Sequence, residues 1–135
     1  MTQEDKELLL KDMCARLTYG VKIEVVENND FSSIEELDCY YLNRVGNNFY
    51  SIKPYLFPLS SMTEEQKEKY CLFQDKIIYN GIRVVNEDIM EYLNWCYKNH
   101  LDIMEYLNWC YKNHLDINSL ISKGLAIDAT GLGIY

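Results

Sequence analysis

The sequence predicts an α+β fold, in which N-terminal, central and C-terminal helices pack on a short antiparallel sheet of four or five strands. Leucines, Met13 and Cys14 recur at helical spacing near the N-terminus, whereas residues 21–27 alternate apolar and polar side chains as a half-buried strand does. A third observation is an amphipathic helical pattern late in the chain. The length of 135 residues suits a single domain, residues 1–135.

The first helix is expected to begin after Thr2, because a threonine N-cap followed by Asp5 suits the first turn. Tyr19-Gly20 should end it, before the strand at 21–27. The next six residues, NNDFSS at 28–33, are predicted to form a loop.

Two further strands are predicted at 38–45 and 49–57, on either side of the turn residues 46–48. Pro54 and Pro58 lack an amide donor, so they should push the far end of the latter strand to a sheet edge or out of the ladder.

A central helix should start near residue 63, where two capping signals overlap: Ser61 with Glu64, and Thr63 with Gln66. After it, the β-rich arms around Asn80-Gly81 predict a hairpin over 77–85.

One fourteen-residue sequence then occurs twice, at 88–101 and 102–115, without a changed residue. Perfect identity indicates a recent duplication, natural or engineered. Each unit reads as an amphipathic helix, and fourteen residues turn a helix by about 1400°, about 40° short of four turns. We therefore favour one continuous helix over a break at the first Asn-His-Leu-Asp. A short helix is predicted from Asp116 to Gly124.

The core has room for one such unit, so the surplus apolar side chains should be exposed or should pair with a second chain. This predicts self-association through the duplicated helix. The candidate interaction residues are Tyr92, Trp95, Tyr106 and Trp109.

The repeat also places a cysteine four residues before a histidine in each copy, giving weak candidate zinc ligands: Cys96, His100, Cys110 and His114. Because one pair is a copy of the other, we favour a buried cysteine and a histidine at the helix end, with no metal or cofactor. A Cys–His nucleophile lacks any supporting motif, so no catalytic residue is assigned.

The formal net charge of −8 comes without a cluster of basic residues, which argues against nucleic-acid binding. No apolar run is long enough for a membrane span, and the N-terminus does not resemble a signal peptide. These features predict a cytoplasmic protein whose cysteines are reduced and mostly buried.

Three segments carry a resemblance: KDMCARLTYGVKIEV at 11–25, KPYLFPLSSMTEEQKEKY at 53–70 and NHLDINSLISKGLAIDATGLGIY at 113–135. They resemble a family of small uncharacterised proteins encoded by gut Bacteroidales and their phages and prophages. The resemblance implies a mobile-element context and supplies no catalytic residue. The family pattern has one helix before Asn-His-Leu-Asp, and this chain departs from it in having two copies.

Three functional hypotheses follow. A non-enzymatic module that binds a host or phage protein is favoured. The first alternative is an inhibitor of a host defence nuclease, whose acidic surface mimics DNA. The second is a small enzyme or ligand-binding domain with an unrecognised pocket.

Overall fold

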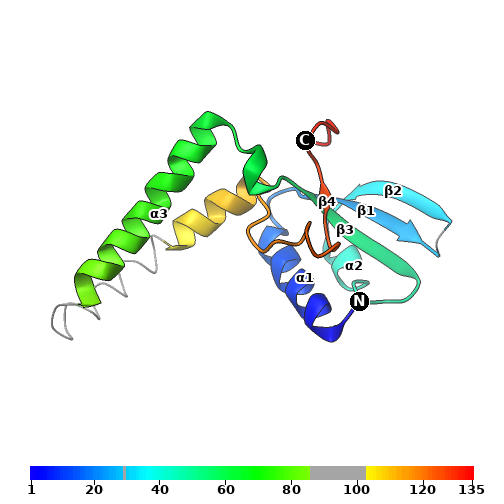
Figure 1. Ribbon diagram of the computed structural model, residues 1–135. Helices are drawn as coiled ribbons and strands as arrows, with labels where there is room; N and C mark the ends of the chain where they lie inside the picture. The colour runs from blue at the N-terminus through cyan, green and yellow to red at the C-terminus, as the bar shows by residue number, and fades with distance from the viewer. Residues whose placement is uncertain (29, 86–102) are drawn as a thin grey trace. The chain divides into compact units, whose positions relative to one another are not determined.

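The computed structural model describes residues 1–28, 30–85 and 103–135 (Figure 1). The chain forms two compact units. Unit 1 comprises Met1–Ser61 and Tyr111–Tyr135, and unit 2 comprises Met62–Cys110. Among the described helices, none is both long and apolar enough to cross a bilayer.

Unit 1 is built on a four-stranded sheet, which confirms the α+β class. The strands are β1 (Lys22–Glu27), β2 (Phe31–Glu36), β3 (Tyr50–Leu56) and β4 (Ile127–Asp128). Their order is β2-β1-β3-β4, so β2 lies at one edge (Figure 1). The pairs β1–β2 and β1–β3 are antiparallel as predicted, but β4 runs parallel to β3 and makes the sheet mixed.

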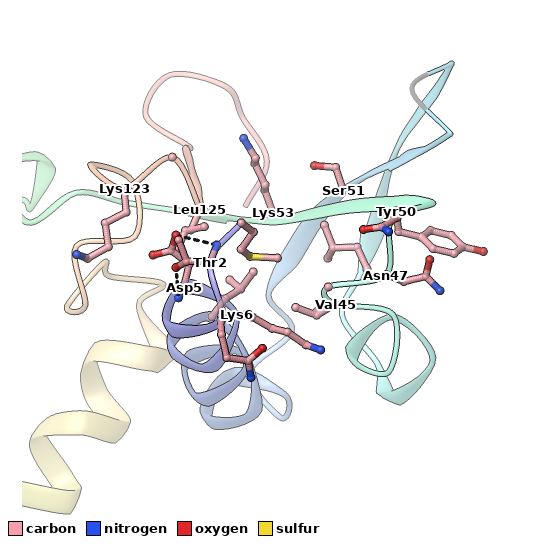
Figure 2. Close-up of a pocket in the computed structure, with 17 residues that line it drawn as sticks. Thr2, Asp5, Lys6, Val45, Asn47, Tyr50, Ser51, Lys53, Lys123 and Leu125 are labelled. Carbon is pink, nitrogen blue, oxygen red and sulfur yellow. Dashed lines mark hydrogen bonds between the residues drawn. The ribbon is translucent and has the colours of Figure 1, made fainter.

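The core lies between this sheet and α1 (Gln3–Arg16). Val21, Ile23 and Val25 are buried on one face, which confirms the predicted alternation, and they pack with Leu9 and Met13 of the helix. The Thr2 hydroxyl accepts the Asp5 amide at 3.0 Å and the Asp5 carboxylate accepts the Thr2 amide, so the helix begins at a capping box (Figure 2).

Residues 38–45 are not a strand, contrary to the prediction. The Asp38 carboxylate accepts the Tyr41 amide at 3.1 Å and begins α2 (Cys39–Leu42), a single helical turn. Aromatic and β-branched composition suggested a strand here, but the N-cap decides the local backbone.

The predicted loop at 28–33 is also wrong, because β2 starts within it. Asn28 takes a positive φ of 52° and the Asp30 amide donates to the Glu27 carbonyl at 3.2 Å, which closes a hairpin between β1 and β2. The polar residues are thus turn residues of a hairpin.

Pro54 stays in the ladder between β3 and β1, and no described strand pairs with its other side. It is buried opposite Ile23 of β1. On the other side, β4 pairs only with Tyr55 and Leu56, so that ladder begins after the proline. Beyond Pro58 the chain makes the short 3₁₀ helix η1 (Leu59–Ser61).

Unit 2 begins with α3 (Glu64–Val85), which confirms the predicted start near residue 63. Thr63 and Gln66 form the capping box, with side-chain bonds of 3.0 and 3.2 Å, whereas the Ser61 hydroxyl donates to the Pro58 carbonyl instead. The predicted hairpin at 77–85 is wrong, because α3 continues through it. Asn-Gly permits a tight turn but does not force one inside a longer helix.

Residues 103–112 of the second repeat copy are helical. Most of the first copy, together with the first Asn-His-Leu-Asp, lies outside the described residues, so the continuous helix stays a prediction. The end of the second copy belongs to unit 1, where Leu115 is fully buried and bridges Phe57. Residues 97–101 of the first copy are identical to 111–115 of the second. Only the second copy is followed, five residues after its leucine, by Leu120, another core residue.

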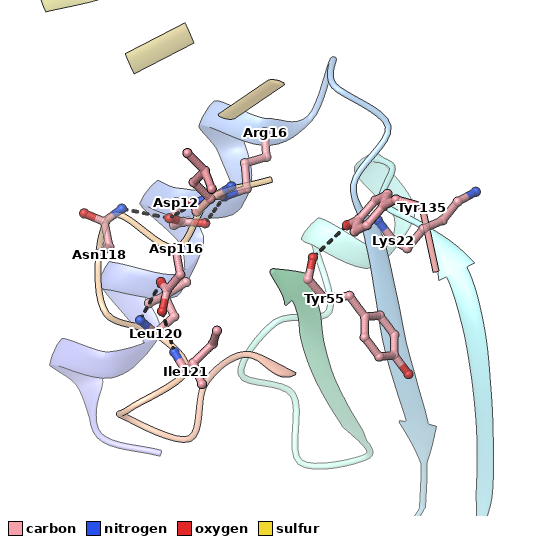
Figure 3. A network of polar contacts seen from close by, with 10 residues as sticks. Asp12, Arg16, Lys22, Tyr55, Asp116, Asn118, Leu120, Ile121 and Tyr135 are labelled. Carbon is pink, nitrogen blue, oxygen red and sulfur yellow. Dashed lines mark hydrogen bonds and ion pairs between the residues drawn. The ribbon is translucent and has the colours of Figure 1, made fainter. Parts of the chain in front are cut away.

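The predicted helix from Asp116 is replaced by a series of turns. The Asp116 carboxylate accepts the amides of Leu120 and Ile121 at 2.8 and 3.0 Å, farther along the chain than an N-cap reaches (Figure 3). Ser119 takes a positive φ of 57°, which interrupts helical geometry.

A buried ion pair joins α1 to these turns. Asp12 and Arg16 are both 0% exposed, and the Arg16 Nη2 lies 3.1 Å from the Asp12 Oδ2 (Figure 3). The same Nη2 donates to the Leu115 carbonyl at 2.7 Å, and the side-chain Nδ2 of Asn118 donates to the Asp12 carboxylate at 2.7 Å. The guanidinium also lies 4.9 Å from the centre of the Tyr111 ring.

The C-terminal residue closes the sheet end of the same network. The Tyr135 hydroxyl donates to the Tyr55 carbonyl at 2.7 Å and accepts the Lys22 amide at 2.9 Å (Figure 3). Its ring stacks on His114 at 3.7 Å. Burial raises the pKa of Tyr135 to about 12, so the phenol stays protonated at neutral pH.

We expect Arg16→Met to lower the free energy of unfolding by about 3–5 kcal/mol, because it leaves the Asp12 carboxylate buried without its cation. Urea denaturation measures the loss. Lys22→Ala is the matched control: it removes a partly exposed ion pair of 3.6 Å with Glu36 and should cost less than about 1 kcal/mol. Equal losses in the two variants would contradict the assigned role. If Arg16→Met does not fold, adding Asp12→Leu should restore part of the stability.

His114 should make stability depend on pH. Burial, then the nearby Arg16 charge, lowers the pKa of His114 from 6.5 to about 4, so the folded state holds the neutral imidazole. The unfolded chain binds a proton first as pH falls, and stability should therefore decrease between pH 6.5 and 4, by up to about 3 kcal/mol. Urea midpoints across this range measure it. His114→Gln should reduce the slope, whereas His100→Gln, the same change in the other copy, should leave the His114 contribution in place.

Candidate functional site

The candidate zinc ligands are not brought together in the described structure. Cys110 is buried in unit 2 near the end of its helix, and His114 lies beyond that helix in a turn with φ 56°. The helical four-residue spacing that would put both on one face therefore does not hold. Cys96 and His100 lie outside the described residues. Within the described ranges, no three metal-binding side chains form a cluster.

The cysteines differ from the expectation in their exposure. Cys14, Cys39 and Cys71 are exposed, and only Cys110 of the four described cysteines is buried. All four are free thiols.

The predicted interaction aromatics of the second copy contact α3. Tyr106 lies 5.8 Å from Tyr70 and 5.7 Å from Phe73, and Trp109 lies 5.8 Å from Phe73, all between ring centres. Both residues are half-buried, and burial raises the pKa of Tyr106. They pack unit 2 in this structure, while Tyr92 and Trp95 lie outside the described residues.

A groove of about 690 Å³ opens in unit 1 beside the start of α1, the residue 45–48 turn and β3. Three lysines, Lys6, Lys53 and Lys123, line it, but their side chains point in different directions in Figure 2. The lining includes no histidine or cysteine, and Thr2 and Asp5 are bonded to each other in the capping box. The lining therefore holds neither a serine–histidine nor a cysteine–histidine pair.

The buried network of Asp12, Arg16 and His114 contains ionisable groups that resemble catalytic ones. Among the described residues, Arg16 Nη1 and His114 Nδ1 are buried without a hydrogen-bond partner. However, Asp12 and Arg16 have no solvent-accessible side-chain surface, and they bond to each other, to the Leu115 carbonyl and to the Asn118 side chain, all within unit 1. These bonds fix α1 against the turns that follow Leu115.

The remaining candidate is the free edge of β2. The strand pairs with β1 through six consecutive residue pairs, and no other described strand pairs with its outer side. A sheet edge presents unpaired amides and carbonyls that can bind another extended chain. The backbone thus supplies a recognition element that needs no catalytic side chain.

Apolar side chains accompany this edge. Phe31 is 65% exposed and Ile34 is 54% exposed, although both belong to the strand. Ile34 stands opposite Glu24, on the sheet face away from the core, whereas Phe31 stands opposite Glu27 and points to the other face. An added strand would therefore find an apolar contact on each face.

The surroundings of β2 are acidic. Between Lys22 and Arg44 the chain has six carboxylates and no basic residue: Glu24, Glu27, Asp30, Glu35, Glu36 and Asp38. Burial raises the pKa of Tyr41, and the negative charges of Glu35 and Asp38 raise it further. These two carboxylates therefore make the electrostatic potential around Tyr41 more negative.

In the segment that follows, exposed Tyr40 and half-buried Tyr50 lie near the half-buried Arg44. The Arg44 guanidinium stacks 3.3 Å from the centre of the Tyr40 ring and lies 5.7 Å from that of Tyr50. Tyrosine and arginine are enriched in the energetically important parts of protein interfaces.

The loop predicted at 28–33 hides the start of β2, so the sequence does not predict this edge. The available signal was the Asn-Asn-Asp turn between two short segments of strand-like composition, which is typical of a three-residue hairpin loop.

Comparisons with known proteins add no functional assignment. No protein-family model, curated protein or solved structure matches this sequence.

Proposed function

We propose that this chain is a non-enzymatic protein-binding module, which adds an extended segment of a partner protein to β2. The observation that carries the proposal is an unpaired six-residue edge with exposed Phe31 and Ile34. Strand addition is a recurrent mode of recognition: main-chain hydrogen bonds supply affinity and alternate side chains supply specificity.

The lack of protection along this edge supports the proposal. Proteins usually block a free strand with lysine, proline, a bulge or a covering segment. β2 contains neither lysine nor proline, and its unbroken register with β1 excludes a bulge. Within residues 1–28, 30–85 and 103–135, no strand pairs with this apolar edge, as expected of a binding surface.

The resemblance to proteins of Bacteroidales and their phages suggests where to search for the partner, among host or phage proteins. Self-association through the duplicated helix is a separate proposal, and the exposed Ile103 and Met104 of the second copy are compatible with it.

The acidic surface around β2 supports a second candidate function, an inhibitor that mimics DNA and binds a host defence nuclease. Six carboxylates without a basic residue among them could take the place of DNA phosphates on the basic surface of a nuclease. Phe31 and Ile34 lie among these charges and favour strand addition, because a phosphate mimic gains nothing from apolar groups there. Release of the bound partner by duplex DNA would favour mimicry.

The third candidate function is a small enzyme or ligand-binding domain. The groove beside α1 gives it weaker support. Its lysines diverge and its lining contains neither histidine nor cysteine.

We expect Ile34→Lys to abolish capture of the partner from a Bacteroidales lysate, because it replaces the apolar contact of the added strand with a charged side chain. Capture by the tagged chain with quantitative mass spectrometry measures the effect. Leu72→Lys is the matched control, since Leu72 on α3 is 69% exposed and lies outside the edge. A protein captured equally by wild type and both variants does not use β2, and that result would refute the proposal.

A further inference from the structure

The charges around β2 limit the chemistry of any strand that binds there. Two of the six carboxylates face a lysine: Glu36 pairs with Lys22 at 3.6 Å, and Glu24 stands opposite Lys53 of β3. The other four have no ion pair within the described part of the chain: Glu27, Asp30, Glu35 and Asp38. The edge therefore carries excess negative charge.

These carboxylates occur before, within and after the binding strand. Glu35 belongs to β2 itself, Asp30 precedes the strand in the hairpin turn, and Asp38 follows it as the cap of α2. An extended segment paired with β2 would pass each of them, whichever direction it ran.

On the basis of the proposed function, we infer that the partner segment is cationic: an extended strand in which lysine or arginine alternates with β-branched or other apolar residues. Successive residues of a strand point to opposite faces, so the apolar positions meet Ile34 on one face of the sheet and the basic positions meet Glu35 and the Phe31 ring on the other. Complementary charge also speeds association and rejects acidic strands.

A second copy of this chain does not meet these requirements at β2. Pairing two β2 edges would bring the same six carboxylates of each copy together without adding a basic residue from that segment. Like charges across a sheet are destabilising. We therefore expect any self-association of this chain to use a surface other than β2.

Three synthetic ten-residue peptides test the inference against the ¹⁵N-labelled full chain. In each, valine alternates with one other residue: lysine, threonine or glutamate. The lysine peptide should shift the amide resonances of residues 31–36 and bind about fivefold or more tightly than the threonine peptide, while the glutamate peptide should not bind. Raising the salt concentration should weaken only the lysine peptide's advantage.

Matched variants locate the charge effect. Asp30→Asn with Glu35→Gln should weaken binding of the lysine peptide about fivefold and leave the threonine peptide unchanged. Glu65→Gln with Glu68→Gln removes two exposed carboxylates from α3 and should change neither affinity.

The outcomes distinguish the two proposals. If the threonine and lysine peptides bind β2 equally, the cationic specificity is wrong and strand addition stands. If the lysine peptide shifts resonances elsewhere and ignores Asp30→Asn with Glu35→Gln, the inference is also overturned. If no peptide perturbs β2 and Ile34→Lys leaves partner capture unchanged, the proposed function itself fails.

Discussion

Unit 1 depends on the buried contact between α1 and the segment that follows the repeat. Asp12 and Arg16 lie on successive turns of one helix and have no exposed side-chain surface, so their charges can be satisfied only by each other and by neighbouring polar groups. Arg16 supplies the hydrogen bond for the Leu115 carbonyl, and Asp12 receives the Asn118 amide. A segment nearly one hundred residues later is thereby fixed against the first helix.

This constraint explains why β4 and the C-terminus lie where they do. Once Leu115 is fixed, Asp116 orders the following turns, and the chain returns to the sheet to pair with Tyr55 and Leu56. Tyr135 then bonds to two strands at once, through the Tyr55 carbonyl and the Lys22 amide. One edge of the sheet is thus covered by the C-terminal segment, whereas β2 at the other edge has no described strand beside it.

Local signals predicted the elements that local chemistry controls. The capping boxes at Thr2 and Thr63 and the alternation of Val21, Ile23 and Val25 were readable because each requires only residues a few positions apart. The strand β2 and the parallel β4 depend on pairing with distant segments, and the two-residue length of β4 leaves no periodicity to detect. Asn80-Gly81 misled for the opposite reason: a strong local turn signal lies inside a 22-residue helix.

The candidate site was the least predictable feature. Charge was visible in the sequence, but the edge position of β2 follows from strand order, which no short segment encodes. Tyr106 and Trp109, which were favoured from sequence, are half-buried and contact Tyr70 and Phe73, and their role in an interaction stays a prediction.

Hydrogen exchange along β2 tests strand addition most directly, because added main-chain hydrogen bonds protect amides whatever side chains the partner carries. The measurement compares residues 31–36 in the free chain and in the complex with the captured partner. The account predicts that the outward-facing amides, every second residue of the strand, exchange at least about tenfold more slowly in the complex. Unchanged exchange across β2 with the partner bound would contradict it.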